Sequence, residues 1–111
     1  MDYEQIIMQI IVNGGDARTN ALKAIRCARK GSLKEAEELM KCAEEAMSKA
    51  HETQTGLIQA EARGEKSEVT LLMVHAQDHL MNAMTVKDLA AEMIEESKLR
   101  QKQQKNKEGE D

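Results

Sequence analysis

Apolar residues recur along this chain with the spacing of amphipathic helices, in three segments separated by short polar breaks. In the first segment, residues 2–30, apolar positions repeat at the i, i+1, i+4, i+5 spacing of one helix face. The second segment, residues 33–63, places alanine, leucine and methionine on one side and glutamate and lysine on the other. The third, residues 68–100, carries apolar residues on more than one face. The pattern therefore predicts three long helices.

Glycine and serine mark the expected ends of these helices. Residues 13–15, Asn-Gly-Gly, interrupt the first pattern. Two adjacent glycines cost about 2 kcal/mol of helix propensity, so we expect a kink or short break that divides the first helix in two. Residues 31–32, Gly-Ser, end that helix, and the serine forms a capping box with Glu35 that opens the second. Ser67 is the expected cap of the third helix.

Composition agrees with an all-helical protein. Hydrophobic residues make up 41% of the chain and charged residues 32%, with no Phe, Trp or Pro and one Tyr. The residues that strands favour are scarce, so a sheet is not expected. The net charge of −4 argues against nucleic-acid binding, which needs a basic face. No apolar run approaches the roughly 20 residues that cross a bilayer, so we expect a cytoplasmic protein without membrane insertion.

The lengths of the helices predict the shape of the molecule. Helices of roughly 28 residues are about 42 Å long, whereas a compact domain of this size has a radius of gyration of about 13 Å. We therefore expect an elongated, antiparallel three-helix bundle over residues 1–97. Residues 98–111 form a charged tail without apolar periodicity, which we expect to fray. The surplus apolar surface of the third segment favours self-association.

Reactive side chains gather in one run, residues 74–80, Val-His-Ala-Gln-Asp-His-Leu. His75, Asp78 and His79 share one side of the predicted helix. They can be interior histidines with the aspartate as their hydrogen-bond partner. They can instead be a transition-metal site, because histidines at i and i+4 with a carboxylate between them match ligand spacing. In a third interpretation, His75 is a nucleophile, because a neutral imidazole can attack phosphorus at physiological pH. Spacing alone does not choose among the three.

The same run closely resembles the active-site helix of the lactose/cellobiose-specific IIA family of the bacterial phosphotransferase system. The resemblance spans residues 4–97 and includes further matching motifs in the same order, at residues 11–18, 36–40 and 50–59. It implies a homotrimer of three-helix subunits that acts as a phosphotransferase component through a phosphohistidine.

The resemblance also implies roles for individual residues. His75 would accept a phosphoryl group from the phosphocarrier protein HPr and pass it to a cysteine of the cognate IIB component, which works with a membrane IIC component. Gln77 would lie near the active histidine. The three copies of Asp78, one from each subunit, would together bind one metal ion at the centre of the trimer. Mg²⁺ suits such all-oxygen ligands. His51 and His79 would be packing or orienting residues.

Two other function classes and the choice of sugar stay open at the level of sequence. A non-catalytic helical adaptor would display its apolar stripe to a partner helix. In a helix-borne metal-binding protein, binding of zinc would depend on His75 and His79 together, whereas in the phosphocarrier only Asp78 would bind the ion. Cys27 and Cys42 lack metal-site spacing and are expected to be reduced packing residues. The transported sugar, a β-linked disaccharide such as cellobiose or lactose, is not determined.

Overall fold

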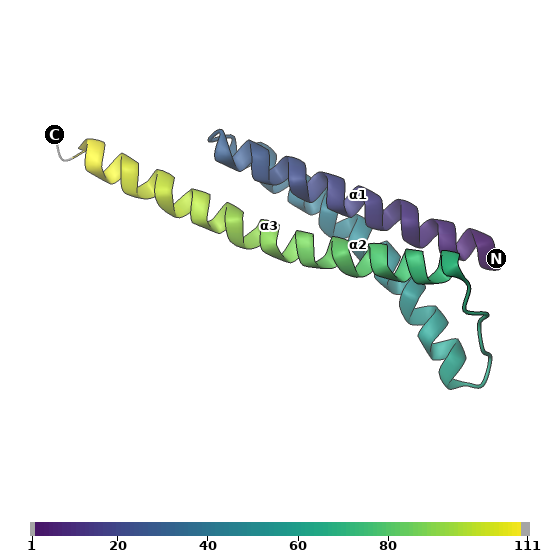
Figure 1. The fold of residues 1–111 in the computed structure, drawn as a ribbon. Coiled ribbons are helices and arrows are strands. Elements are labelled where there is room, and N and C mark those ends of the chain that lie inside the picture. The colour runs from purple at the N-terminus through teal and green to yellow at the C-terminus, as the bar shows by residue number, and fades with distance from the viewer. Residues whose placement is uncertain (1, 110–111) are drawn as a thin grey trace.

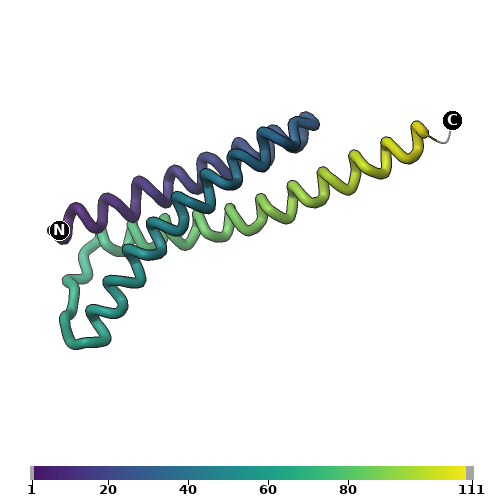
Figure 2. The backbone as a smooth tube through the Cα atoms, turned by 180° about the vertical axis from the view of Figure 1, so that it is seen from behind, coloured from purple at the N-terminus to yellow at the C-terminus, as the bar shows by residue number. Residues whose placement is uncertain are grey.

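The structure, a computed structural model, describes residues 2–109 and consists of three α-helices (Figure 1). These are α1 (Tyr3–Arg29), α2 (Leu33–Ala62) and α3 (Leu71–Gly109), with no strand among the described residues. The helices α1 and α3 run in the same direction, and α2 runs in the opposite direction (Figure 2). The molecule measures 67 × 20 × 19 Å, which confirms the predicted elongated bundle.

The starts of α1 and α2 are set by local signals in the sequence. The carboxylate of Asp2 accepts a hydrogen bond of 2.8 Å from the backbone N–H of Glu4. Gly31 has a φ of +90°, as expected for a glycine that ends a helix. Ser32 is the N-cap of α2, but its side chain makes no capping hydrogen bond, so the predicted capping box with Glu35 is not formed. The predicted boundary is confirmed, whereas the predicted hydrogen bonding is wrong.

The start of α3 lies later than the sequence suggested. The hydroxyl of Thr70 accepts a hydrogen bond of 3.1 Å from the backbone N–H of Met73, so Thr70 rather than Ser67 caps the helix. The preceding loop is tied to the start of α1, because the Tyr3 hydroxyl donates to the backbone carbonyl of Glu68. This tertiary contact lies within the segment that precedes the first helical turn of α3.

The glycine pair of α1 does not break the helix, contrary to the prediction. α1 is continuous through residues 13–15, and Gly14 is buried. A Cβ on Gly14 would lie 3.5 Å from His79 Cδ2 and 3.7 Å from Leu80 Cα, so this part of α1 packs closely against α3. Tertiary packing of the neighbouring apolar residues outweighs the propensity cost of the two glycines.

The core divides into two clusters along the rod. The cluster towards the start of α1 contains larger buried side chains from all three helices, among them Ile7, Ile10, Met47, Met73 and Leu80. The cluster towards the end of α1 is built largely from alanines, namely Ala21, Ala24, Ala28, Ala36, Ala43 and Ala90, with Met40 and Ile94. Short side chains let the helices lie close together at this end. α1 packs along both other helices, whereas α2 and α3 touch each other less.

The last turns of α2 diverge from the other two helices. Figures 1 and 2 show this part of α2 pointing away from α1 and α3, with residues 63–70 returning the chain to the start of α3. The divergence opens a space between the last turns of α2 and the start of α3, while Gln54, earlier on α2, still reaches Gln77 of the reactive run. None of the described helices is long and apolar enough to cross a membrane.

The C-terminal segment continues α3, where the sequence analysis expected a frayed tail from residue 98. The helix extends to Gly109, beyond the ends of α1 and α2 (Figure 1). Lysine, glutamine and glutamate are good helix formers, and no helix breaker occurs before Gly109. The last two residues of the predicted tail, Glu110 and Asp111, lie outside the described residues.

The first turn of this segment is fixed by contacts with the other helices. Ser97 is buried, and Lys98 Nζ lies 2.7 Å from the carboxylate of Glu37 on α2. The side-chain amide of Gln101 donates a hydrogen bond of 3.4 Å to the backbone carbonyl of Ala28 near the end of α1. The bundle therefore extends past residue 97.

Candidate functional site

The first turns of α3 present two neighbouring surfaces with different chemistry. The histidine flank consists of Leu72, His75 and His79, and the aspartate flank consists of Val74, Asp78 and Met81. The two flanks follow from helical spacing, since each set repeats at three or four residues. Between the flanks and the rest of the bundle, buried side chains of α3 such as Leu80 fix the helix in place.

His75 is the exposed member of the histidine pair. Its ring stacks against that of His79, with ring centroids 6.0 Å apart and planes at 15°. His75 is exposed and His79 is half-buried. Among the described residues, neither ring takes part in a side-chain hydrogen bond, so Asp78 is not their partner. The reading of His75 as an interior histidine is therefore wrong, and its imidazole is open to an incoming group.

His79 lies against the glycine pair of α1. A Cβ on Gly15 would stand 3.3 Å from His79 Nε2, which is closer than an ordinary side-chain contact. Gly14 faces the Cδ2 edge of the same ring. The glycines of residues 13–15 thus leave room for an imidazole from another helix. The sequence alone predicts a helix break at this Asn-Gly-Gly motif, because the partner ring lies 64 residues further along the chain.

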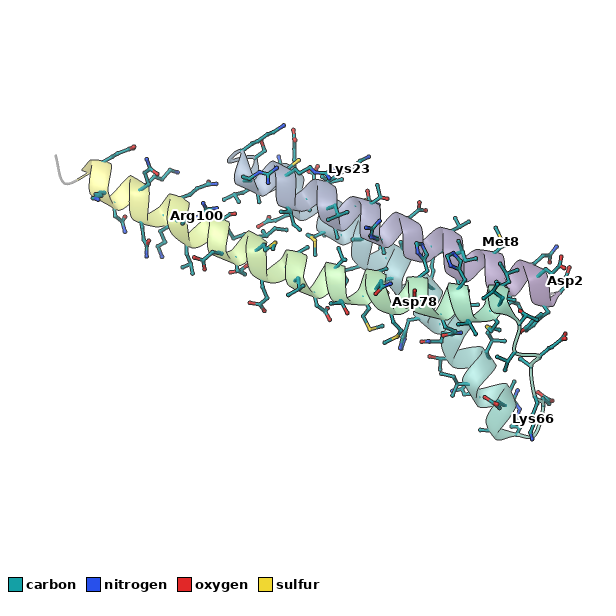
Figure 3. The ribbon with its side chains drawn as sticks, viewed as in Figure 1. Asp2, Met8, Lys23, Lys66, Asp78 and Arg100 are labelled. Carbon is teal, nitrogen blue, oxygen red and sulfur yellow. The ribbon has the colours of Figure 1, made fainter. Side chains whose placement is uncertain are left out.

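Asp78 occupies the exposed surface of α3 (Figure 3). Its Oδ2 accepts a long hydrogen bond of 3.4 Å from the side-chain amide of Asn82, one turn along the helix. Within residues 2–109, no three His, Cys, Asp or Glu side chains converge to hold a metal ion. A site made by His75, Asp78 and His79 of one chain is therefore not supported. Asp78 offers one carboxylate per chain.

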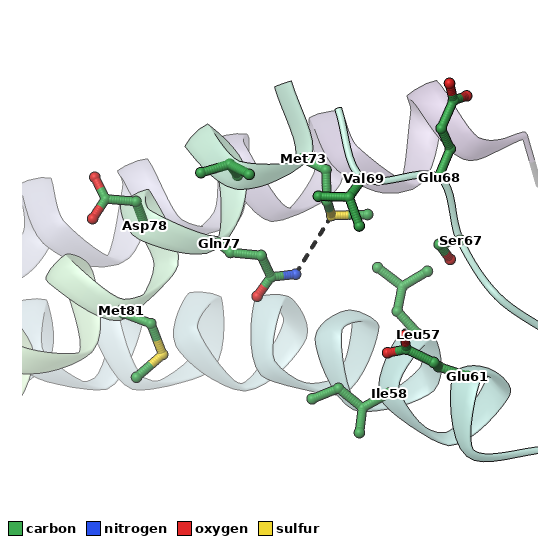
Figure 4. Close-up of a pocket in the computed structure, with 11 residues that line it drawn as sticks. Leu57, Ile58, Glu61, Ser67, Glu68, Val69, Met73, Gln77, Asp78 and Met81 are labelled. Atoms are coloured by element: carbon green, nitrogen blue, oxygen red, sulfur yellow. Dashed lines mark hydrogen bonds between the residues drawn. The ribbon is translucent and has the colours of Figure 1, made fainter. Parts of the chain in front are cut away.

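Gln77 points towards α2 and away from the histidine flank. Its carbonyl oxygen accepts a hydrogen bond from the side-chain amide of Gln54, and its own amide donates to Met73 Sδ at 3.6 Å (Figure 4). Within one chain, the side chain expected near the active histidine thus connects α3 with α2. The role of Gln54 as the partner of Gln77 cannot be predicted from the sequence, because a hydrogen bond between helices leaves no local signal.

An open groove lies between the diverging end of α2, the 63–70 loop and the aspartate flank. Its volume is about 500 Å³, and its walls are mostly apolar, with Leu57 and Ile58 on one side and Val69 and Met73 on another. Asp78 stands at the rim with its carboxylate turned outward (Figure 4). Val74 and Met81 also line the groove and are 52% and 49% exposed.

The remaining candidate residues lie apart from these flanks. His51 is exposed on α2, so the packing role expected for it is wrong. Cys27 and Cys42 are both free thiols. Cys27 is half-buried as expected, whereas Cys42 is exposed and does not pack in the core.

Comparison with known proteins identifies the family. Residues 5–98 match the family model described as "PTS system, Lactose/Cellobiose specific IIA subunit". The lichenan-specific phosphotransferase enzyme IIA component of Bacillus subtilis (strain 168) is 62% identical over 94 residues, which cover 85% of this chain and 86% of the relative. The cellobiose-specific EIIA component of Lactococcus lactis subsp. lactis (strain IL1403) is 48% identical over 93 residues, 84% of this chain and 80% of the relative.

Solved structures give the same answer. The crystal structure of the cellobiose-specific enzyme IIA from Bacillus anthracis matches with a TM-score of 0.86 and 53% identity, over 91% of this chain and 94% of that one. A IIA(Chitobiose) chain solved in complex with HPr matches with a TM-score of 0.78 and 35% identity, over 91% and 98% of the two chains. These likenesses do not favour a non-catalytic adaptor. The chain belongs to the lactose/cellobiose-specific IIA family and is a phosphocarrying component of the phosphotransferase system.

Proposed function

We propose that this chain carries a phosphoryl group on His75 between phospho-HPr and a cysteine of its cognate IIB component. The observation that carries the proposal is the exposed imidazole of His75 in a chain of this family. His79, the other histidine of the run, is half-buried against α1. The third histidine, His51, stands on α2, where no second histidine ring stacks on it.

The chemistry is two displacements at phosphorus. An imidazole nitrogen of His75 attacks the phosphohistidine of HPr, so that a new N–P bond forms while the N–P bond to HPr breaks and frees its imidazole. A thiolate of IIB then attacks the same phosphorus, so that an S–P bond forms and His75 is released. Neither step needs a sugar-binding site on this chain. Its one aromatic residue, Tyr3, is engaged with the loop before α3.

Both partners would dock over the exposed residues of the histidine flank, Leu72 and His75, and over the adjoining face of α1. Met8 and Val12 precede Gly15 by two turns and one turn on the same side of α1, and they are 48% and 54% exposed. Figure 3 shows Met8 pointing outward from α1. Because Gly15 faces His79, these apolar side chains lie beside the flank that carries His75. Exposed apolar anchors around one imidazole suit successive docking of two partners.

The aspartate flank would form the contact between three copies of the chain. Leu71, Val74 and Met81 are exposed apolar residues around Asp78, and such a patch is unusual on a surface that faces only water. In a homotrimer, three copies of Asp78 would hold one divalent cation. The Asp78 carboxylate fits this role, since it is exposed and the hydrogen bond that its Oδ2 accepts from Asn82 is long. Oxygen ligands favour a hard ion, and Mg²⁺ is the first choice.

The transported sugar would be a β-linked disaccharide such as cellobiose, or lactose, and the chain would act in the cytoplasm with a membrane IIC component. Support comes from the names of the relatives, which include cellobiose-, lichenan- and N,N′-diacetylchitobiose-specific components. Uptake of each sugar by cells with and without the gene for this chain tests the choice. An unchanged uptake of all β-linked disaccharides would contradict it.

The phosphoryl acceptor is tested by labelling. Incubation with phosphoenolpyruvate, enzyme I and HPr should add one acid-labile phosphoryl group, and addition of IIB should remove it. His75→Ala should abolish labelling. His51→Ala is the matched control, because it removes another exposed histidine and leaves the sequence of α3 unchanged. It should be labelled like the wild type. Persistent labelling of His75→Ala would disprove the assignment.

A further inference from the structure

We propose that His79 is a positioning residue for phosphoryl transfer, and that α1 fixes its ring through Gly15. His79 would set the plane of the His75 imidazole without contacting the phosphoryl group. The inference rests on the proposed role of His75 as phosphoryl acceptor.

The first step is the contact between His79 and α1. The ring is half-buried, with Cδ2 near Gly14 and Nε2 near Gly15. A Cβ on Gly14 would meet the ring at 3.5 Å, an ordinary van der Waals distance, whereas a Cβ on Gly15 would meet it at 3.3 Å. An alanine at position 15 would therefore require the ring to shift by a few tenths of an ångström, while one at position 14 would make an ordinary contact. Gly15 is the position on α1 at which an added side chain would disturb His79.

The second step is the stack between the two imidazoles. His75 and His79 lie one turn apart, and their planes are within 15° of parallel. A centroid separation of 6.0 Å falls in the range of interacting aromatic pairs. No side-chain hydrogen bond within residues 2–109 holds the exposed His75 ring. His75 stacks on the ring of His79, so a displacement of His79 would change the orientation of the His75 ring.

The third step is the requirement of the reaction. Transfer at phosphorus needs the attacking nitrogen in line with the leaving nitrogen, and a misplacement of about 1 Å can cost roughly 10²-fold in rate. An exposed imidazole on a helix surface can adopt several rotamers, and all but one would be unproductive. A ring held by His79 would meet HPr and then IIB in one orientation. Such a device changes the rate of the step and leaves partner affinity unchanged.

The test compares three glycine and histidine variants with one control. In Gly15→Ala and in His79→Leu, we expect kcat for transfer from phospho-HPr to fall by roughly 10-fold to 10²-fold while KM is unchanged. His79→Phe keeps a planar ring and should recover most of the rate lost in His79→Leu. Gly56→Ala is the matched control, because that helical glycine has nothing within 4 Å of an added Cβ. It should transfer at the wild-type rate.

NMR gives a second readout that a merely structural role would not change. The ¹H–¹⁵N resonances of the His75 ring should shift or broaden in Gly15→Ala and His79→Leu, and stay as in wild type in Gly56→Ala. If His79→Leu does not fold, Gly15→Ala decides the question. An unchanged kcat in Gly15→Ala, or a loss confined to KM, would overturn the inference. Labelling of His75→Ala would instead overturn the proposed acceptor, so the two failures are distinguishable.

Discussion

The two flanks of α3 differ in what lies behind them. Behind the histidine flank, α1 is close enough that the glycine pair faces His79 directly. Beside the aspartate flank, the end of α2 diverges to leave a groove, and the Gln54–Gln77 hydrogen bond joins α2 to α3. One helix thus packs closely against α1 on the side of His75 and presents an open apolar surface on the side of Asp78. In the proposed scheme, the first surface serves phosphoryl transfer and the second serves association.

The first prediction concerns the aspartate flank and carries the largest effect. Three carboxylates around one axis repel by about 4 kcal/mol per pair at 4 Å with an effective dielectric of about 20, unless a cation lies between them. Asp78→Lys should dissociate the proposed trimer, and a chelator should weaken the wild-type trimer. Asp78→Leu should stay trimeric and become insensitive to the chelator, since apolar packing removes the need for the ion.

Sedimentation of the three proteins with and without chelator provides the measurement. All three should still be labelled at His75 when their helices are intact, because the histidine flank does not depend on Asp78. A wild type that is monomeric with Mg²⁺ present, or an Asp78→Leu protein that dissociates, would show that the aspartate flank is not the association surface.

The second prediction concerns Leu80, which lies beneath both flanks. Its side chain is 0% exposed, so Leu80→Ala should lower the free energy of unfolding by about 2–5 kcal/mol through lost burial and a residual cavity. Leu89→Ala, at a leucine of the same helix that is 54% exposed, should change it by no more than about 0.5 kcal/mol in the dissociated chain. Urea titration measures both. Equal effects would mean that the buried face of α3 is misplaced.

The third prediction concerns the bridge across the groove. Replacement of Gln54 and Gln77 by methionine, singly and together, should give a coupling free energy of roughly 0.5–1.5 kcal/mol in a double-mutant cycle. Transfer from phospho-HPr should be little changed in the monomeric chain, because Gln77 points away from His75. A large fall in kcat for Gln77→Met that does not appear in Gln54→Met would contradict this expectation. It would indicate that Gln77 lies close to an active histidine during transfer.

The smallest predicted effect lies far from both flanks, at the ion pair between Glu37 and Lys98. The hydrogen bond and charge of Lys98 hold the pKa of Glu37 below its ordinary 4.5, and the hydrogen bond that Lys98 donates to the Glu37 carboxylate raises the pKa of Lys98 above its ordinary 10.5. The pair therefore stabilises the bundle between these two values. The contribution of the pair to stability is lost when the pH falls through the lowered pKa of Glu37. It is also lost when the pH rises through the raised pKa of Lys98.

Melting temperatures of wild type and Glu37→Gln provide the measurement. We expect a slight difference near pH 7 that disappears once the pH has fallen below the lowered pKa of Glu37, and also in 1 M salt, where the Debye length is about 3 Å. The Glu37 side chain is exposed and that of Lys98 is partly exposed, so water screens the pair and keeps the effect small. A difference that grows as the pH falls would contradict the assignment. His75 labelling should be the same in both proteins.

Much of this protein could be predicted from local signals in its sequence. Apolar periodicity is a property of each segment alone, so it located all three helices, and Gly31 marked the first turn through its backbone freedom. The long helices also fixed the rod shape, because their length exceeds the size of a compact domain. The run at residues 74–80 contains His75, the proposed phosphoryl acceptor, and through resemblance it indicated the family, which is confirmed.

Contacts between residues distant in sequence decided the rest. The glycine pair was interpreted as a break because propensity sums only local terms, whereas the buried face of α1 holds the helix continuous against α3. The direction of Gln77 depends on Gln54, from another helix. The tail is helical, with its first turn held by Gln101 and Lys98 in contacts to α1 and α2. A local pattern states which face a residue occupies, but the partner on that face is determined only when the helices pack.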